Sequence, residues 1–250
     1  MRKSFSRIMT LTLRNLKEIV RDPVSLIFLL ALPLVMEILF YFLFHNMTSQ
    51  FEMKYLAPGI VVFSQAFLSL FSGQLIAVDR ASSFLTRLFV SRARSFEFIL
   101  GYAFALVPIS LFQSVLFYLV GGIIDPSIFC IGMVWGILAS VLTSLLFMGL
   151  GIMLGSLCTE RSVGGVASVI ISAQSLLSGM WFPVENMNAG FLTLMNCLPF
   201  KNATVLVQNS LNGIGDTFDD FLKPLLIVLG YTLLAFISAT IFFRRKMKSQ

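Results

Sequence analysis

Glu37 is the residue of this chain that is best placed to do chemistry, because it is the one formal charge inside a long apolar run. Inside a bilayer an ionisable side chain is costly and usually faces protein or water. Two interpretations of Glu37 stay open. Its carboxyl group contacts a polar path or a subunit interface, or it is a protonated or snorkelling acid that its neighbours satisfy.

Residues for other kinds of chemistry are sparse. The sole histidine is His45, and Cys130, Cys158 and Cys197 are scattered, so they define neither a disulfide framework nor metal-ligand spacing. The sequence contains no G-x-x-x-x-G-K-[ST] loop to hold nucleotide phosphates. We therefore expect this chain to be no enzyme, with no catalytic, cofactor or metal site of its own.

Membrane-spanning helices are the elements that must position Glu37. The 250 residues are 57% hydrophobic and 12% charged, whereas a soluble domain averages about 25% charged residues. A span needs roughly 20 apolar residues, and the runs are continuous, unlike the alternating segments of a closed barrel. We predict an all-α polytopic membrane protein in which residues 1–250 form one transmembrane domain. Its six spans are expected near 24–44, 57–78, 99–121, 128–156, 163–182 and 224–243.

Lysine and arginine residues are distributed very unevenly between the two sides of this predicted topology. Residues 1–23, the loop 79–97, the loop at Arg161 and the C-terminal tail together hold 15 of them, and the other side holds three. Because basic residues near span ends stay inside, we predict a multi-pass protein of the cell membrane with both termini and the 79–97 loop cytoplasmic. This asymmetry accounts for the pI of 9.5, so a nucleic-acid partner is not expected.

Two segments outside the spans are predicted to lie at the membrane surface. Residues 4–21 carry a stripe of apolar residues at helical spacing with arginines and lysines on other faces, which is typical of an amphipathic interfacial helix. The stripe consists of Phe5, Met9, Leu13, Leu16 and Val20. The segment 183–223 is predicted to be external, and its uncharged run of 13 residues, 188–200, is too short to span. A re-entrant hairpin or an interfacial helix fits that run better.

The loop between the second and third spans has the pattern of a short cytoplasmic helix. Asp79 can cap or begin this helix, because an acid suits the positive end of the helix dipole. Phe84, Leu85, Leu88 and Phe89 then form one narrow apolar face, and four arginines lie elsewhere. Such a helix could dock in a groove of a soluble partner. Alternatively, the loop rests on lipid headgroups.

Four stretches resemble the membrane subunits of type-two ABC transporters, the exporter class with six spans per subunit. They are "RNLKEIVRDPVSLIF" (14–28), "YLAPGIVVFS" (55–64), "DRASSFLTRLFVSRARSFEFILGY" (79–102) and "SGMWFPVENM" (178–187). They are similar to the connecting helix, the start of the second span, the coupling-helix region, and the fifth span with its external hairpin. Residues 79–83 depart from the R-E-x-G-T pattern of the family, and the proline common after the coupling helix is absent.

This resemblance implies one permease half that works as a homodimer or with a similar subunit. A separate ATPase subunit, which binds ATP and Mg, would then dock on the coupling region. The coupling residues on this reading are Arg80, Phe84, Leu85, Arg87, Leu88 and Phe89.

The resemblance also implies a central cavity lined by the second and fifth spans. With Glu37, the polar candidates are Gln65, Ser69, Ser72, Gln74, Gln174, Ser175 and Ser178. Hydrogen bonds between helices are the alternative role for these side chains. A largely apolar cavity would favour export of amphipathic cargo such as a drug, a peptide, a lipid or a glycan. An ATPase-independent secondary transporter, with Glu37 as its coupling group, and a membrane scaffold protein remain alternatives.

Overall fold

A computed structural model describes residues 2–82, 95–182, 187–213 and 217–248, and these residues form helices without any strand. The helices are α1 (Arg2–Val20), α2 (Pro23–Phe44), α3 (Met53–Ala81), α5 (Ser95–Ile124), α6 (Ile131–Leu157), α7 (Glu160–Leu177), α8 (Ala189–Cys197), α9 (Pro199–Asn212) and α10 (Lys223–Lys248). Short helical turns lie at Ser49–Phe51, Pro126–Ile128 and Phe218–Leu222. The all-α prediction is therefore confirmed for the described residues.

Among the described residues, five helices are long and apolar enough to cross a membrane. They are α2 from Leu26, α3, α5, α6 and the helix that ends in α10. Predicted spans one, two, three, four and six correspond to them, which supports a multi-pass membrane protein.

The remaining predicted span, 163–182, falls on α7 and differs from its prediction. α7 has 18 residues and begins with Glu160 and Arg161, so it lacks the continuous apolar length of the other five. The helix ends at Leu177 rather than at residue 182. Gly179 follows with a φ of 73°, a left-handed conformation that glycine adopts easily and that ends helices. The crossing of the membrane by α7 thus stays a prediction.

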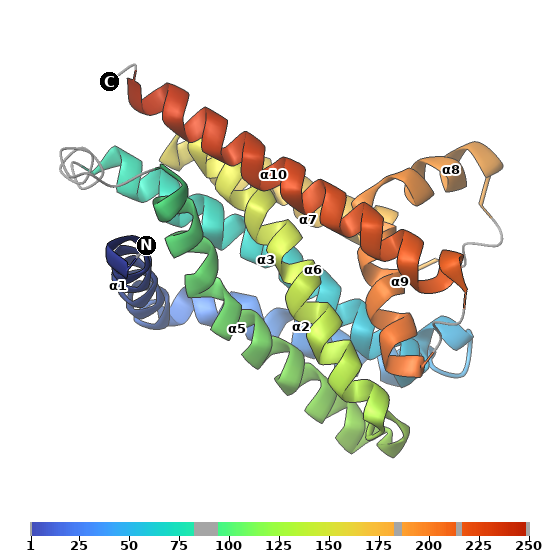
Figure 1. Cartoon of the computed structure of the whole chain (residues 1–250). Helices are drawn as coiled ribbons and strands as arrows, with labels where there is room; N and C mark the ends of the chain where they lie inside the picture. The colour runs from blue at the N-terminus through green and yellow to red at the C-terminus, as the bar shows by residue number, and fades with distance from the viewer. Residues whose placement is uncertain (1, 83–94, 183–186, 214–216, 249–250) are drawn as a thin grey trace.

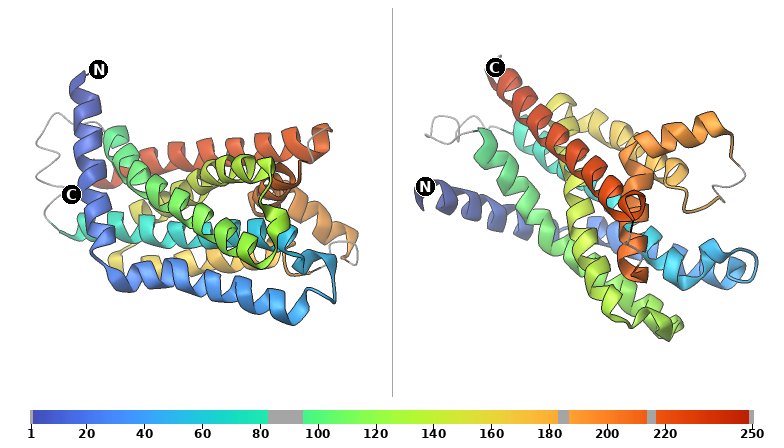
Figure 2. Two further views of the ribbon diagram at one scale, coloured as in Figure 1. Left: turned by 90° about the horizontal axis from the view of Figure 1, so that it is seen from below. Right: turned by 45° about the vertical axis from the view of Figure 1, so that its right-hand side comes forward.

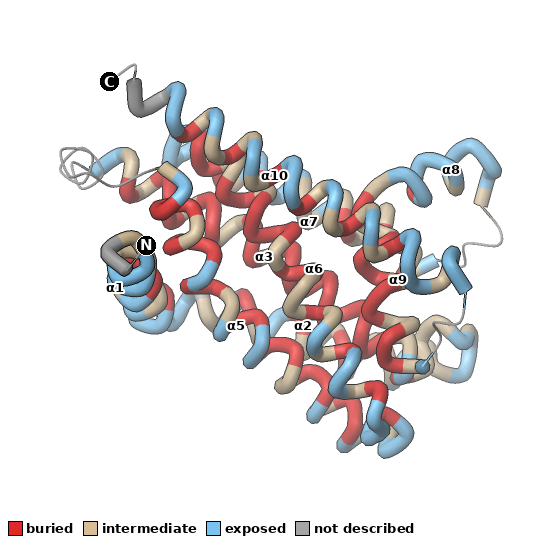
Figure 3. Tube along the Cα trace, viewed as in Figure 1, coloured by how far each residue is buried: buried red, intermediate tan, exposed pale blue. Residues whose placement is uncertain are grey.

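α3 lies at the centre of the bundle and packs against α2, α5, α6, α7 and α9. In Figure 3 the buried residues follow α3 and the inner faces of its neighbours. Glycines in α6 allow this close packing: a Cβ on Gly151 would lie 2.0 Å from Ser72 Oγ, and one on Gly155 would lie 2.3 Å from the carbonyl oxygen of Gly73. The small residues of the fourth predicted span therefore serve helix packing, as membrane helices commonly require.

α1 lies across one end of the bundle, roughly perpendicular to the long helices (Figure 2). It packs against α5 through a buried face that consists of Leu11, Thr12, Asn15 and Ile19. The predicted apolar stripe points elsewhere: Phe5, Met9, Leu13 and Val20 are exposed, and Leu16 is half-buried. The helix itself is thus confirmed, and the exposed stripe remains available for lipid.

The segments that the charge pattern assigns to one side share one end of the bundle. In Figure 1 the N-terminal end of α1, the C-terminal end of α10 and the ends of α3 and α5 that flank residues 83–94 lie together.

The prediction that Asp79 begins a helix is wrong, because α3 continues to Ala81 and Asp79 lies in its last turn.

At the opposite end, α8 and α9 form the segment between α7 and α10 (Figure 1). The uncharged run 188–200 is not a single helix, because α8 ends at Cys197 and α9 begins at Pro199. Proline suits a first helical position. α8 is largely exposed, whereas α9 packs against α3, α6 and α10 through residues such as Leu206 and Val207.

Candidate functional site

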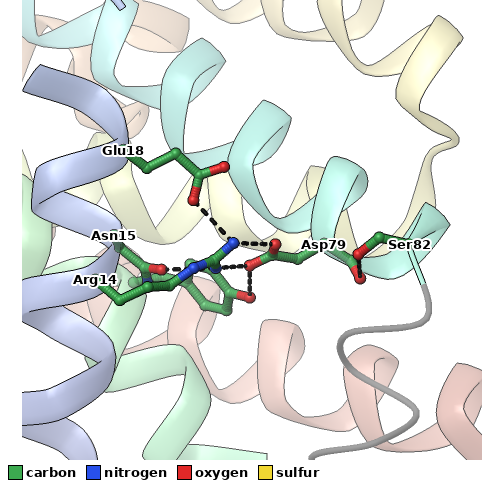
Figure 4. A network of polar contacts seen from close by, with 6 residues as sticks. Arg14, Asn15, Glu18, Asp79 and Ser82 are labelled. Carbon is green, nitrogen blue, oxygen red and sulfur yellow. Dashed lines mark hydrogen bonds and ion pairs between the residues drawn. The ribbon is translucent and has the colours of Figure 1, made fainter. Parts of the chain in front are cut away.

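The strongest polar network of the molecule joins α1 to the last turn of α3 (Figure 4). The guanidinium of Arg14 contacts both carboxylate oxygens of Asp79, with an Nη2–Oδ1 distance of 2.7 Å. Tyr102 of α5 donates its hydroxyl hydrogen to Asp79 Oδ2 at 2.6 Å. The Asp79 side chain is 3% exposed, and this bidentate geometry is the strongest form of arginine–carboxylate pairing. Three helices therefore meet at one buried carboxylate.

Arg14 also holds the neighbouring residues of α1 in place. Its guanidinium lies 3.0 Å from Asn15 Oδ1 and 2.9 Å from Glu18 Oε2. The hydrogen bond to Asp79 raises the pKa of Arg14 above its usual value. Partial burial raises the pKa of Glu18 in spite of the nearby Arg14. Arg14 is therefore a permanent cation in this network, and Asp79 is the more buried of its two carboxylate partners.

A second ion pair joins α1 to the first turn of α5. Arg7 Nη2 lies 2.9 Å from Glu97 Oε1, and Ser4 donates a hydrogen bond to the same oxygen. The Glu97 side chain is 1% exposed. Arg7 and Arg14 are seven residues apart, which is about two turns, so they project from the same face of α1.

We call Arg7, Arg14, Asp79 and Glu97 the clamp. Asp79 lies just before residues 83–94 and Glu97 lies just after them, so the clamp fixes both ends of that loop to one helix. Sequence reasoning did not single out the clamp as a site. The available signal was an acid at each end of the basic loop together with two arginines seven residues apart in the preceding amphipathic helix.

Of the six predicted coupling residues, the structure describes only Arg80. Its Nη1 donates hydrogen bonds to the carbonyl oxygens of Gly155 at 2.6 Å and Cys158 at 3.2 Å. Carbonyls in the last turn of a helix lack partners within the helix, so Arg80 caps the end of α6. Five predicted coupling residues lie outside the described residues: Phe84, Leu85, Arg87, Leu88 and Phe89.

The polar candidates on α3 lie mainly between α3 and α6. Gln65 donates from Nε2 to the carbonyl oxygen of Ser140 at 2.7 Å and accepts from Thr143 Oγ1 at 2.8 Å. Ser72 donates to the carbonyl oxygen of Met148 at 3.3 Å. Ser69 is also fully buried and donates to Ala66 O of its own helix. Gln65 and Ser72 thus make hydrogen bonds between helices, which was the alternative role given to these side chains, whereas Ser69 bonds within its own helix.

The remaining cavity candidates have three different surroundings. Gln174 is buried and donates to Thr204 Oγ1 of α9 at 3.1 Å. Ser175 accepts from Trp181 Nε1 at 3.0 Å, and Ser178 accepts from the backbone N–H of Met180 at 3.2 Å. Gln74 lines a hollow of about 160 Å³ together with Glu18, next to the clamp. The structure therefore does not bring the predicted cavity residues together in one place within a single chain.

α7 instead exposes a small polar stripe on one of its faces. Gly165, Ser168 and Ser172 are exposed and recur at intervals of three and four along one face. A Cβ on Gly165 would meet nothing within 4 Å among the described residues. Serine and glycine on the outside of a membrane helix are typical of helix–helix contact rather than of contact with lipid.

Glu37 of α2 is fully buried and faces α5. Neither of its carboxylate oxygens has a hydrogen-bond partner among the residues that the structure describes. The carboxyl group lies against the backbone of α5, where a Cβ on Gly121 would be 3.1 Å from Glu37 Oε1. Burial of a carboxyl group without a hydrogen-bond partner costs free energy. The contacts within the described chain therefore give no stabilising role to Glu37.

If the carboxyl group of Glu37 contacts cargo or a second subunit in a transport path, as one of the two sequence interpretations has it, Glu37→Leu removes about one hydrogen bond of about 1.4 kcal/mol and should lower transport by about tenfold, with membrane insertion unchanged. Glu37→Gln should be milder, because it keeps the shape and the hydrogen-bonding groups of the side chain. Transport of a labelled cargo in vesicles or cells measures both variants at matched expression. Full activity of Glu37→Leu would show that the acid has no role in transport.

Comparison with known protein families supplies independent information on the whole chain. Residues 6–211 match the family model described as ABC-2 type transporter. The match extends from α1 through the clamp and the central helices to the end of α9. A comparison with curated proteins found no match.

Proposed function

Because the chain belongs to the ABC-2 type transporter family, we propose that this membrane protein is the permease subunit of an ATP-driven exporter, energised by a separate ATPase subunit. Membership makes the chain the membrane component of an ABC transporter. The observation that carries the finer proposal is the clamp, which ties both ends of loop 83–94 to α1 through Arg14–Asp79 and Arg7–Glu97.

The clamp suits transmission of force from a soluble partner to the spans. If the ATPase binds the loop, a movement of the ATPase is transmitted to α3 through Asp79 and to α5 through Glu97. α1 meanwhile holds Asp79 and Glu97 at a fixed position relative to each other. Ion pairs with almost fully buried carboxylates resist such displacement better than exposed pairs do. ATP and Mg are bound and used by the partner in this proposal, and this chain contributes no catalytic group.

The proposed topology has six spans, with α7 as the fifth and with both termini cytoplasmic. Support comes from the charge asymmetry and from Figure 1, where the N-terminal end of α1, the C-terminal end of α10 and the ends of α3 and α5 that flank residues 83–94 lie at one end of the bundle. α7 is short and carries an exposed small polar stripe, so its proposed place is against protein rather than lipid. A second permease subunit is the partner that would cover it and complete the path.

This arrangement predicts cross-linking between two copies through α7. In a background without Cys130, Cys158 and Cys197, Ser168→Cys should give a dimer with a short bismaleimide reagent. The matched control is Leu233→Cys on α10, which is 62% exposed and should stay monomeric. Denaturing gel electrophoresis of cross-linked membranes reads the result. Equal yields of cross-linked dimer at both positions would show that α7 does not form the interface between the two copies.

The proposed cargo is amphipathic: a drug, a peptide, a lipid or a glycan. Support comes from the composition of the spans, in which charged side chains are few and Glu37 is an acid buried within α2. A site with so few charges suits a molecule with a large apolar part better than it suits a small ion.

Co-purification tests the proposed function. The tagged full-length chain, expressed in its native membrane and extracted in mild detergent, should retain an ATP-hydrolysing subunit. Transport by the purified complex in proteoliposomes should require ATP. Transport that persists without nucleotide and follows a proton gradient would instead favour a secondary transporter, a candidate that the unpartnered carboxyl group of Glu37 supports. Absence of both activities would favour a scaffold.

A further inference from the structure

A basic hollow of about 700 Å³ lies on the polar side of α1 where this helix leads into α2. Its lining includes Thr10, Leu13, Arg14, Lys17 and Arg21, together with the acids Glu18 and Asp22. Thr10 already donates its hydroxyl hydrogen to Ser6 O. The groups of this hollow that can bind a ligand are therefore its cations.

Two cations of the hollow have no ion-pair partner among the residues that the structure describes. Glu18 pairs with Arg14, and Asp22 has an interaction of its own. Lys17 and Arg21 are exposed and form no ion pair with any residue in the described parts of the chain. Because they are four residues apart, they project side by side from the helix. Among the described residues, the hollow thus presents two adjacent cations without an ion pair, beside the acid Asp22.

The position of the hollow along the chain places it at the level of lipid headgroups. α2 begins at Pro23, and its membrane-spanning part begins at Leu26, so Arg21 lies within about two turns of the start of the hydrocarbon region. Leu13, Lys17 and Arg21 follow one another at intervals of four. This row starts at the exposed apolar stripe of α1, which includes Leu13 and Val20, and ends among cations.

We propose that this hollow binds the phosphate headgroup of an anionic phospholipid. Lys17 and Arg21 contact the phosphate, and the neighbouring apolar stripe of α1 contacts the glycerol and the upper part of the acyl chains. Basic residues next to an apolar helix face are attracted to anionic lipid in this way. The exposed apolar stripe beside the cations and the short distance along the chain to the start of the span at Leu26 both favour a lipid over a soluble anion.

The site also lies beside the clamp, because Arg14 lines the hollow and pairs with Asp79. A bound headgroup would hold α1 at the membrane surface in the position in which Arg7 and Arg14 reach their carboxylates. This consequence rests on the proposed function, whereas lipid binding itself does not.

The test is native mass spectrometry of the full-length chain in detergent with added phosphatidylglycerol. Lys17→Gln/Arg21→Gln should weaken binding by about thirtyfold, since each basic residue near an anionic surface contributes about 1 kcal/mol and 1.4 kcal/mol is tenfold. The matched control is Lys54→Gln/Lys223→Gln, which removes two cations that already pair with Glu52 and Asp219 and should change binding less than threefold. Phosphatidylcholine should bind equally to all three proteins.

Two results would overturn the proposal. Equal retention of phosphatidylglycerol by wild type and by Lys17→Gln/Arg21→Gln would show that the hollow is not the site. Binding of glycerol 3-phosphate as tight as that of the lipid would identify a site for soluble phosphate instead. Neither measurement involves an ATPase or transport, so failure here is distinguishable from failure of the proposed function.

Discussion

Asp79→Ala should lower coupled transport at least tenfold while the protein still inserts into the membrane. Removal of this carboxylate leaves Arg14 and Tyr102 without their shared partner. Removing one member of a buried ion pair costs about 3–5 kcal/mol, and the lower end applies here because the Arg14 side chain is 34% exposed. We expect α1 to leave its site, which should appear as much faster proteolysis within residues 2–20 and as a transport rate at least tenfold lower.

The control for this experiment is Glu18→Gln. It removes the other carboxylate that binds Arg14, in a pair whose two side chains are 34% and 40% exposed. Exposed pairs contribute about 0–1 kcal/mol, so this variant should transport nearly as wild type does. Arg14→Gln combined with Asp79→Ala should cost little more than Asp79→Ala alone, because both changes break one interaction. Additive effects would contradict the clamp.

The spans were predictable from sequence for a physical reason. Backbone groups in lipid must be satisfied within the element, so a span requires a long continuous apolar helix, and the lengths of α2, α3, α5, α6 and α10 reflect this. α7 was predicted less well, because its end depends on the left-handed backbone of Gly179. Whether α7 faces lipid or protein also depends on a partner subunit, which the amino-acid sequence of this chain does not reveal.

α1 illustrates what a pattern of apolar residues leaves open. The stripe through Phe5, Met9 and Leu13 predicted an amphipathic helix correctly. The face that packs against α5 includes Thr12 and Asn15, polar residues that resemble a solvated face in the sequence. Packing against a protein surface can bury such residues when the contact is close, so the sequence predicted the helix and not its docked face.

The clamp was not predicted, because the residues that pair in it lie far apart in the sequence. Asp79 is 65 residues from Arg14, and Glu97 is 90 residues from Arg7. Local reasoning assigned Asp79 to the start of a helix, where an acid is also favourable. The polar residues of α3 show the same limit, because the sequence marks Gln65 as polar in a span but does not show that Ser140 and Thr143 satisfy it.

The second large effect is expected in loop 83–94, whose ends the clamp fixes. If this loop docks in a groove of the ATPase, its apolar side chains should matter more than its net charge. Burial of one such side chain contributes roughly 1.5–3 kcal/mol. Leu88→Ala/Phe89→Ala should therefore weaken association with the ATPase by about tenfold or more and abolish transport, with insertion intact.

A loop that rests on lipid headgroups predicts the opposite sensitivity, because each basic residue near an anionic surface contributes about 1 kcal/mol. The matched variant is Arg92→Gln/Arg94→Gln, which should be nearly neutral for association in pull-down experiments. If the arginine variant loses association and the apolar variant does not, then the docking surface is the charged face of the loop. If neither pair of changes alters association with any ATPase, then the clamp only stabilises the packing of α1 against the spans. The ATPase must in that case bind the permease at another surface.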